Sequence, residues 1–113
     1  MEHVPQSEAG AFQSGAVTSW EYETESPAMN VARIKVEGRY PAEGFTKNRL
    51  VDSIIYVISG SGILGAQDGS HVDLAPHDQL HLAIDDAYFF EGDLELLYCA
   101  TPKWTPEQVG HVE

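Results

Sequence analysis

The chain has 113 residues, of which 42% are hydrophobic, and this length and composition predict one globular domain rather than a disordered chain. Its 18 acidic residues outnumber its 6 basic residues, which gives a formal net charge of −12. A field of this sign repels phosphate backbones and anionic lipids, so we expect no nucleic-acid partner and no membrane partner.

No apolar run approaches the ~20 residues that are needed to span a membrane. The first residues, MEHVPQSEAGAF, have neither the basic start nor the apolar stretch of a secretion signal. Cys99 is the only cysteine, so no disulfide can form within the chain. These features favour a cytoplasmic protein.

Residues 1–14 show no periodicity, and we expect them to form a flexible N-terminal arm ahead of a single domain at 15–113. Alternation of side chains begins at Ala16 and predicts a strand to Tyr22. Met29–Glu37 alternates again and predicts a half-exposed strand of an antiparallel sheet. In the first of these strands one face would carry Thr18, Trp20 and Tyr22, and the other Val17, Ser19 and Glu21.

The strongest strand signal is Asp52–Gly62, because its β-branched and aromatic residues are typical of a strand that is buried on both faces. Gly60 and Gly62 predict a tight turn into another strand at Ile63–Gln67. Gly92 in turn predicts a break between two late strands. The remaining strands are expected at Ser70–Leu74, Gln79–Ile84, Ala87–Glu91 and Asp93–Cys99.

One short helical turn is predicted near the C-terminus, at Thr105–Gln108. Thr105 is a capping residue, Pro106 occupies the first helical position and Gln108 lies three residues after the cap. Gly110 would end this helix after about one turn. About eight short strands with regular turn signals therefore predict an all-β sandwich or barrel.

Several segments resemble those of a small single-domain cupin, a member of the RmlC-like jelly-roll family. Asp52–Gly60 (DSIIYVISG) is similar to the strand that closes the first cupin motif, and Ala75–Leu82 (APHDQLHL) to the lead-in of the second. Glu91–Leu97 (EGDLELL) is similar to the final strand pair. The resemblance implies an all-β fold, the cupin-type double-stranded β-helix or jelly-roll barrel, and a homodimer.

The metal-binding motifs of this family are missing. The first motif normally carries His-x-His-x3-Glu, but counting back from Gly60 places Ser53 at the Glu position and Lys47 and Arg49 at the two His positions. Tyr88 stands where the second motif carries its ligating His. Lysine and arginine have no lone pair to give to a metal, so we expect no metal and no other cofactor.

The resemblance directs Lys47, Arg49 and Ser53 into the barrel, with Tyr88 on a facing strand. Such a cationic cleft would bind a carboxylate or a phosphate, because arginine offers a bidentate fork. Alternatively, both cations extend into solvent from the barrel rim or pair with nearby carboxylates.

A one-residue bulge near Arg49 is a further alternative. It would turn Asn48 and Asp52 toward the cavity, where they could bind a sugar hydroxyl or a hard cation.

Two functions follow as expectations. The first is metal-free binding of a small molecule, anionic or sugar-like, in the barrel. The second is a metal-independent isomerase or epimerase that acts on a sugar or a small organic acid, with Tyr88 or Tyr56 as the acid and His81 as the base. The sequence identifies no substrate. The candidate ligand-binding residues are Lys47, Arg49, Ser53, Tyr88 and His81.

Overall fold

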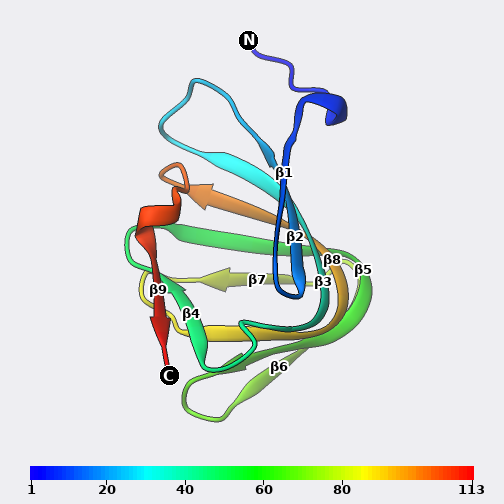
Figure 1. Cartoon of the computed structure of the whole chain (residues 1–113), viewed down its shortest axis with the longest axis vertical. Coiled ribbons are helices and arrows are strands. Elements are labelled where there is room, and N and C mark those ends of the chain that lie inside the picture. Colours follow the sequence, from blue (N-terminus) through cyan, green and yellow to red (C-terminus); the bar gives the residue numbers. More distant parts are fainter.

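Nine antiparallel strands form one sheet that curls into a half-barrel, in a computed structural model that describes all 113 residues (Figure 1). Two short 3-10 helices flank the sheet near the two ends of the chain. None of the helical segments has the length and apolarity that crossing a membrane would require. The elements are η1 (Gln6–Glu8), β1 (Gly10–Ser14), β2 (Val17–Tyr22), β3 (Asn30–Tyr40), β4 (Phe45–Asn48), β5 (Asp52–Ala66), β6 (His71–Leu74), β7 (Gln79–Leu82), β8 (Tyr88–Thr101), η2 (Pro106–Gln108) and β9 (Val109–Val112).

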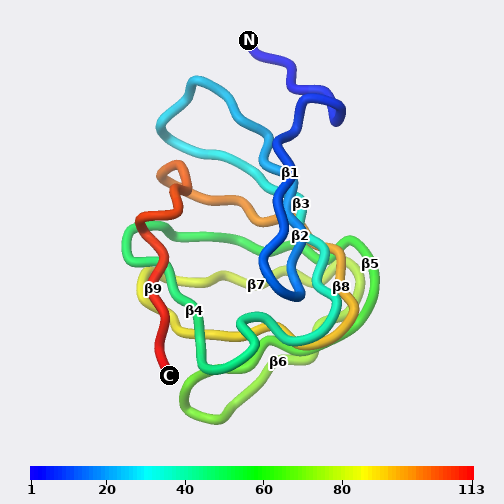
Figure 2. The backbone as a smooth tube through the Cα atoms, viewed as in Figure 1, coloured from blue at the N-terminus to red at the C-terminus, as the bar shows by residue number.

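Strand β8 lies at the centre of the sheet. It pairs with β3 along one edge and with β5 along the other, and the start of β8 also pairs with β4. The order continues outward from β3 through β2 to β1, and from β4 to β9. Strands β6 and β7 pair with the two halves of β5. The long strands β5 and β8 bend together, and this bend closes one side of the half-barrel (Figure 2).

The predicted turn at Gly60–Gly62 is wrong, because β5 runs without interruption to Ala66. The predicted break at Gly92 is also wrong, since β8 is continuous from Tyr88 to Thr101. Gly62 lies directly opposite Gly92, and a Cβ atom added to Gly92 would lie 2.6 Å from the Cα atom of Gly62. The glycines therefore permit a close approach of two bending strands, which is the other common role of glycine in a sheet.

Strand β5 is buried on one face only, which corrects the prediction that both faces are covered. Ser53, Ile55 and Val57 are buried, whereas Ile54 and Tyr56 are 39% and 37% exposed. The reason is that β5 belongs to an antiparallel sheet with an open outer face.

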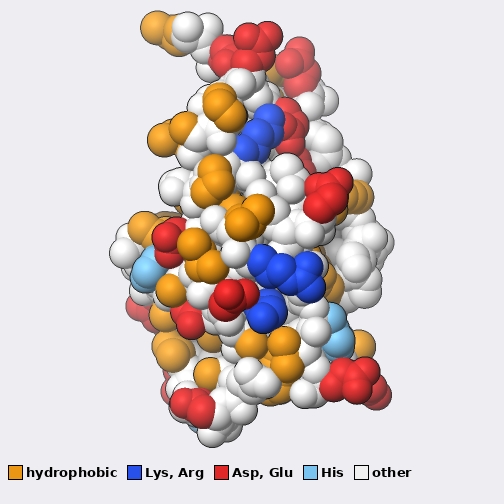
Figure 3. All heavy atoms as spheres, turned by 90° about the vertical axis from the view of Figure 1, so that its left-hand side faces the viewer, with side chains coloured by type: hydrophobic (Ala, Val, Ile, Leu, Met, Phe, Trp, Pro, Cys, Tyr) orange, Lys and Arg blue, Asp and Glu red, His pale blue; other side chains and the backbone are white.

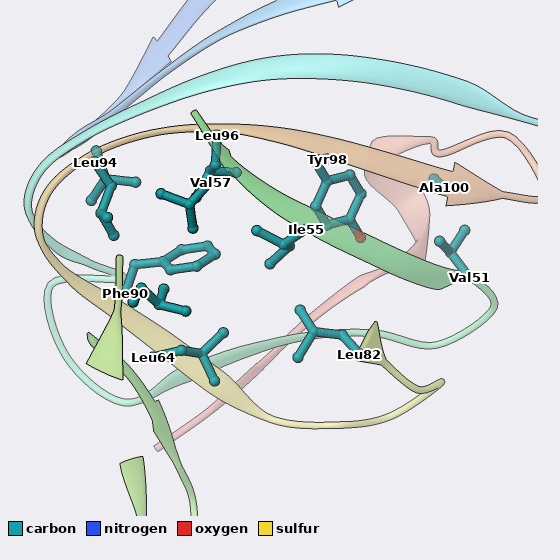
Figure 4. Close-up of a cluster of buried hydrophobic side chains, with 12 residues drawn as sticks. Val51, Ile55, Val57, Leu64, Leu82, Phe90, Leu94, Leu96, Tyr98 and Ala100 are labelled. Carbon is teal, nitrogen blue, oxygen red and sulfur yellow. The ribbon is translucent and has the colours of Figure 1, made fainter. Parts of the chain in front are cut away.

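The hydrophobic core lies on the concave side of the sheet. Figure 4 shows that side chains of β5 and β8 gather in this interior, with Val57 and Leu96 on one side of it and Phe90 and Leu64 on the other. Because the two strands supply most of the core, their long pairing determines the shape of the half-barrel. The cluster consists of Val36, Val51, Ile55, Val57, Leu64, Leu74, Leu82, Phe90, Leu94, Leu96, Tyr98 and Ala100.

Both ends of the chain contribute strands that the sequence did not predict. Gly10–Ser14 pairs with β2, so the second half of the expected flexible arm is strand β1. At the other end the predicted helical turn is confirmed, with a capping box between Thr105 and Gln108. Gly110 follows that turn but lies inside β9, which pairs with β4.

Candidate functional site

A cavity of about 360 Å³ lies on the concave side of the sheet, between β1–β3, β4, β8 and the C-terminal segment. This volume is in the range of small-molecule sites. Ten of the 19 residues that line it are hydrophobic, and eight carry polar or charged side chains. The aromatic residues that line the cavity are Phe12, Tyr40, Tyr88, Phe90, Tyr98 and Trp104.

Glu21 is the only carboxylate that lines the cavity. It lies on the inner face of β2, is half-buried and takes part in none of the ion pairs of the chain. The amide Nδ2 of Asn30 lies 3.5 Å from its Oε2 atom. Burial raises the pKa of Glu21, and the nearby charge of Glu23 raises it further. The cavity thus holds one desolvated acid without a cationic partner.

Asn30 also fixes the C-terminal wall of the cavity. Its Oδ1 atom accepts a hydrogen bond from the backbone N–H of Trp104 at 3.0 Å. Beside it, the Nζ atom of Lys103 forms an ion pair with Glu23 at 2.6 Å and donates to the carbonyl of Thr24. These contacts hold the Trp104 ring against the barrel, where it packs on the core.

Two tyrosines supply hydroxyl groups to the inner wall. Burial raises the pKa of Tyr98, although a hydrogen bond with the buried Ser53 opposes that shift. Burial raises the pKa of Tyr88 far above its ordinary value, and Tyr98 and Tyr40 add to the effect. Both phenols are therefore neutral at pH 7, and they act as hydrogen-bonding groups. The ring of Tyr88 packs edge-on against Phe90, with centroids 5.3 Å apart.

The structure does not bring Lys47 and Arg49 together in the cavity. Lys47 lines the cavity, but its Nζ atom lies 3.3 Å from Oδ1 of Asp85. Arg49 is exposed, and its guanidinium lies beside Gly110. Figure 3 shows that Lys and Arg side chains on this face of the molecule lie next to acidic side chains. The expected cationic cleft is absent.

The reason is a turn that interrupts the strand after Asn48. The Oδ1 atom of Asn48 accepts hydrogen bonds from the backbone N–H groups of Leu50 and Val51, at 2.9 and 2.8 Å. Lys47 and Ser53 therefore belong to different strands. The rule that every second residue of a strand points to the same face does not apply across the turn. Ser53 is buried on the inner face of β5, where it contacts Tyr98 rather than the cavity.

His81 lies on the outer face of the sheet, where its Nε2 atom is 3.1 Å from Oδ1 of Asp52. Tyr56 also points outward, and its hydroxyl lies 2.7 Å from Nδ1 of His77. The expected pairing of Tyr88 or Tyr56 with His81 is therefore not formed in the cavity. The alternative with a bulge predicted that Asn48 and Asp52 both face the cavity. Asn48 does line the cavity, but Asp52 is exposed.

No three His, Cys, Asp or Glu side chains converge in the chain. His71, His77 and His81 are all exposed, and each has a different neighbour. None of them lines the cavity. A site of the kind that holds zinc or iron would need several such ligands at one point.

Sequence reasoning missed Glu21, Tyr98 and Trp104 as cavity residues. The alternation in β2 places Glu21 and Trp20 on opposite faces of the strand. Hydrophobicity alone favours the face with Trp20 as the inner one, and so it points away from Glu21. In the structure Trp20 lies outside, where the guanidinium of Arg33 stacks on its ring at 4.0 Å. This contact covers the indole and leaves the polar face of β2 free to line the cavity.

Comparisons with protein-family models and with curated protein sequences find no match. Solved structures do match over the whole chain. Streptomyces PAC13 with uridine aligns at a TM-score of 0.89 and 18% identity, over 100% of this chain and 92% of that chain. PAC13 is described as a unique nucleoside dehydratase.

Two further structures show the same arrangement of strands. Ectoine synthase from P. lautus has a TM-score of 0.79 at 11% identity, over 100% of this chain and 91% of that chain. The polyketide cyclase RemF from Streptomyces resistomycificus has a TM-score of 0.79 at 16% identity, over 100% and 86%. At these identities the likeness establishes the fold alone. The curled sheet and these neighbours show that the chain has the cupin fold.

Proposed function

We propose that the protein binds a small organic molecule without negative charge in the cavity, and that it does so without a metal ion. The observation that carries this proposal is the composition of the cavity wall. The wall has aromatic rings, phenol hydroxyls and one carboxylate, and its only cation, Lys47, is already paired with Asp85. The volume of about 360 Å³ suits a ligand of the size of a sugar or a nucleoside.

The charges favour the sugar-like ligand over the anionic ligand that the sequence also suggested. An anion would approach the unpaired carboxylate of Glu21 and would have to compete with Asp85 for Lys47. A hydroxyl-bearing ligand instead finds donors and acceptors at Glu21, Asn30 and the tyrosines. The neighbour PAC13, which is seen with uridine, is an example of this fold with a nucleoside.

A thermal-shift screen that compares neutral compounds with their phosphates tests the proposal. The panel pairs uridine with uridine 5′-phosphate, and neutral sugars with sugar phosphates. We expect neutral members to raise the unfolding temperature more than their phosphates do. A ligand at a hundred times its dissociation constant adds ~2.7 kcal/mol to stability.

A cavity-filling variant locates the binding. Ser19 is buried on the cavity wall, so Ser19→Phe should abolish the thermal shift, whereas Thr18→Phe on the outer face should leave it unchanged. Phosphates that stabilise the protein more than the neutral compounds would contradict the proposal. So would a shift that survives in Ser19→Phe.

A metal-independent isomerase or epimerase is a second candidate, and the observation in its favour is that Glu21 and Tyr98 face the same cavity. The carboxylate would act as the base in place of His81, and the tyrosine hydroxyl would donate to a carbonyl oxygen. Incubation with sugars and hydroxy acids in D2O tests it. Deuterium that enters a carbon–hydrogen position with the wild type, but not with Glu21→Gln, would support catalysis, and no incorporation would argue against it.

A further inference from the structure

We propose that the ligand carries a cationic nitrogen, an amine or a quaternary ammonium group, that is held between the carboxylate of Glu21 and the aromatic walls of the cavity. This inference rests on the proposed binding function, and it narrows the ligand from any non-anionic molecule to an organic cation.

The first support is the unpaired charge of Glu21. A carboxylate that is half-buried costs free energy unless a cation or several hydrogen bonds compensate it. Here the only polar contact is the distant amide of Asn30, at 3.5 Å. Four other acidic residues of the chain pair with Lys or Arg, but Glu21 does not. A ligand cation would supply the missing partner.

The second support is the aromatic part of the cavity wall. Tyr40, Tyr88, Tyr98 and Trp104 all border the same cavity. The faces of such rings attract cations within about 6 Å, and Trp and Tyr do so more strongly than Phe. Desolvated cation–π contacts are worth more than exposed ones. A cavity that holds several such rings and one carboxylate has the groups that recognise an ammonium ion.

The chain itself leaves these rings unoccupied. Its two cation–π contacts lie elsewhere, with Arg33 on Trp20 at 4.0 Å and Arg39 on Phe89 at 3.9 Å. Lys47 is the only cation that lines the cavity, and its Nζ atom is held at 3.3 Å from Asp85. No side chain of the protein thus fills the position that a ligand cation would take.

The third support is the field of the whole molecule. A net charge of −12 raises the local concentration of cations and speeds their association. This field would disfavour an anionic ligand for the same reason. The long-range charge and the local chemistry therefore select the same class of ligand.

A bound cation should also change the protonation of Glu21. Burial raises its pKa, and a cation would favour the charged form, so binding should strengthen as the pH rises through the pKa of Glu21 and should release protons at lower pH. The other titratable groups nearby are Glu23, which directly follows β2, and Tyr98 on β8. Lys47, Tyr40 and Tyr88 complete the titratable groups of the cavity wall.

Calorimetric titration with choline and with its neutral isostere, 3,3-dimethylbutan-1-ol, tests the inference. The two probes have nearly the same shape and differ in charge, so the comparison isolates the cation. We expect choline to bind at least tenfold more tightly to the wild-type protein. Glu21→Gln should remove this preference, and Trp104→Leu should weaken it.

Glu37→Gln is the matched control. Glu37 is exposed on β3 and forms no ion pair, so the variant makes the same change in net charge and should keep the preference for choline. Choline that binds no more tightly than the neutral isostere, or not at all, would overturn the inference. The comparison of neutral compounds with phosphates decides the proposed function separately, because it does not depend on a cationic group.

Discussion

Glu21 shows how one side chain can determine the chemistry of the cavity. Its carboxylate is held by β2 on the wall of the cavity, where burial raises its pKa and no basic residue pairs with it. A partly buried carboxylate without a cationic partner raises the free energy of the folded state at neutral pH. A ligand that binds there recovers part of that free energy.

This cost gives a prediction for Glu21→Gln. Burial raises the pKa of Glu21 in the folded state above its ordinary value of 4.5, so the folded chain holds this proton more tightly than the unfolded chain does. Stability therefore falls as the pH rises from 4.5 through the folded-state pKa, and the loss persists at pH 7. We expect Glu21→Gln to be more stable than wild type at pH 7 and to lose that advantage below pH 4.5.

Urea denaturation at pH 4 and pH 7, at equal ionic strength, measures this difference. Glu37→Gln again serves as the control, since it also removes one negative charge, but from an exposed position. A Glu21→Gln variant that is less stable than this control at pH 7 would show that the carboxylate is compensated in the folded protein.

The candidate site could be predicted only in part. Lys47 and Tyr88 do line the cavity, but Arg49 and His81 lie outside it. The count from Gly60 assumed a continuous strand, and the side chain of Asn48 breaks that strand by accepting two backbone hydrogen bonds. Whether Lys47 or Tyr88 contacts a ligand stays a prediction.

At the scale of the elements, strands β5 and β8 carry both the core and the curvature of the sheet. The sequence predicted the β structure of both segments correctly but divided each at a glycine. Local reasoning treats glycine as a turn signal, and only the pairing of Gly62 with Gly92 reveals the close approach. Those residues are far apart in the chain, so no local pattern could have predicted it.

Gly92→Ala tests this role of the glycines. Gly92 has a φ of +140°, which a residue with a side chain rarely adopts. A Cβ atom there would lie 2.6 Å from both Gly62 Cα and the carbonyl oxygen of Ser61. Because neither backbone can move without breaking the pairing, we expect a loss of about 3 kcal/mol in the free energy of unfolding.

Urea denaturation measures that loss as well, with Gly10→Ala as the control. A Cβ atom at Gly10 meets nothing within 4 Å, and its backbone has no positive φ. The control should stay within about 0.5 kcal/mol of wild type. If Gly92→Ala were equally mild, the bend would not depend on the paired glycines.

At the scale of the whole molecule, the cupin fold follows from a sequence that lacks the usual cupin metal ligands. The alternating strands predicted an all-β sandwich or barrel, and the resemblance of Asp52–Gly60, Ala75–Leu82 and Glu91–Leu97 to cupin segments specified the cupin fold. The chemistry was harder to predict, since it depends on a few side chains from β2, β3 and the tail that meet only in three dimensions. The homodimer that the resemblance implies stays a prediction.

The acidic surface gives the last prediction, that sodium chloride stabilises the protein at pH 7. At about 0.01 M salt the screening length is ~30 Å, which exceeds two of the molecule's dimensions of 42 × 27 × 23 Å, so its carboxylates repel one another across the whole fold. At about 0.15 M that length falls to ~8 Å. Salt also weakens the four ion pairs of Lys and Arg, but partly exposed pairs contribute little. The relief of repulsion should therefore exceed this loss.

Thermal unfolding followed by circular dichroism, at several concentrations of sodium chloride, measures the effect. The unfolding temperature should rise with salt at pH 7, where the net charge is −12. At pH 4.5, the isoelectric point of the sequence, the same salt series should leave it unchanged or lower it slightly. Chloride is preferable to sulfate because sulfate stabilises proteins by exclusion from their surfaces, whatever their charge. An equal rise at both pH values would mean that salt acts through such a general effect, and that charge repulsion contributes little to the stability of this protein.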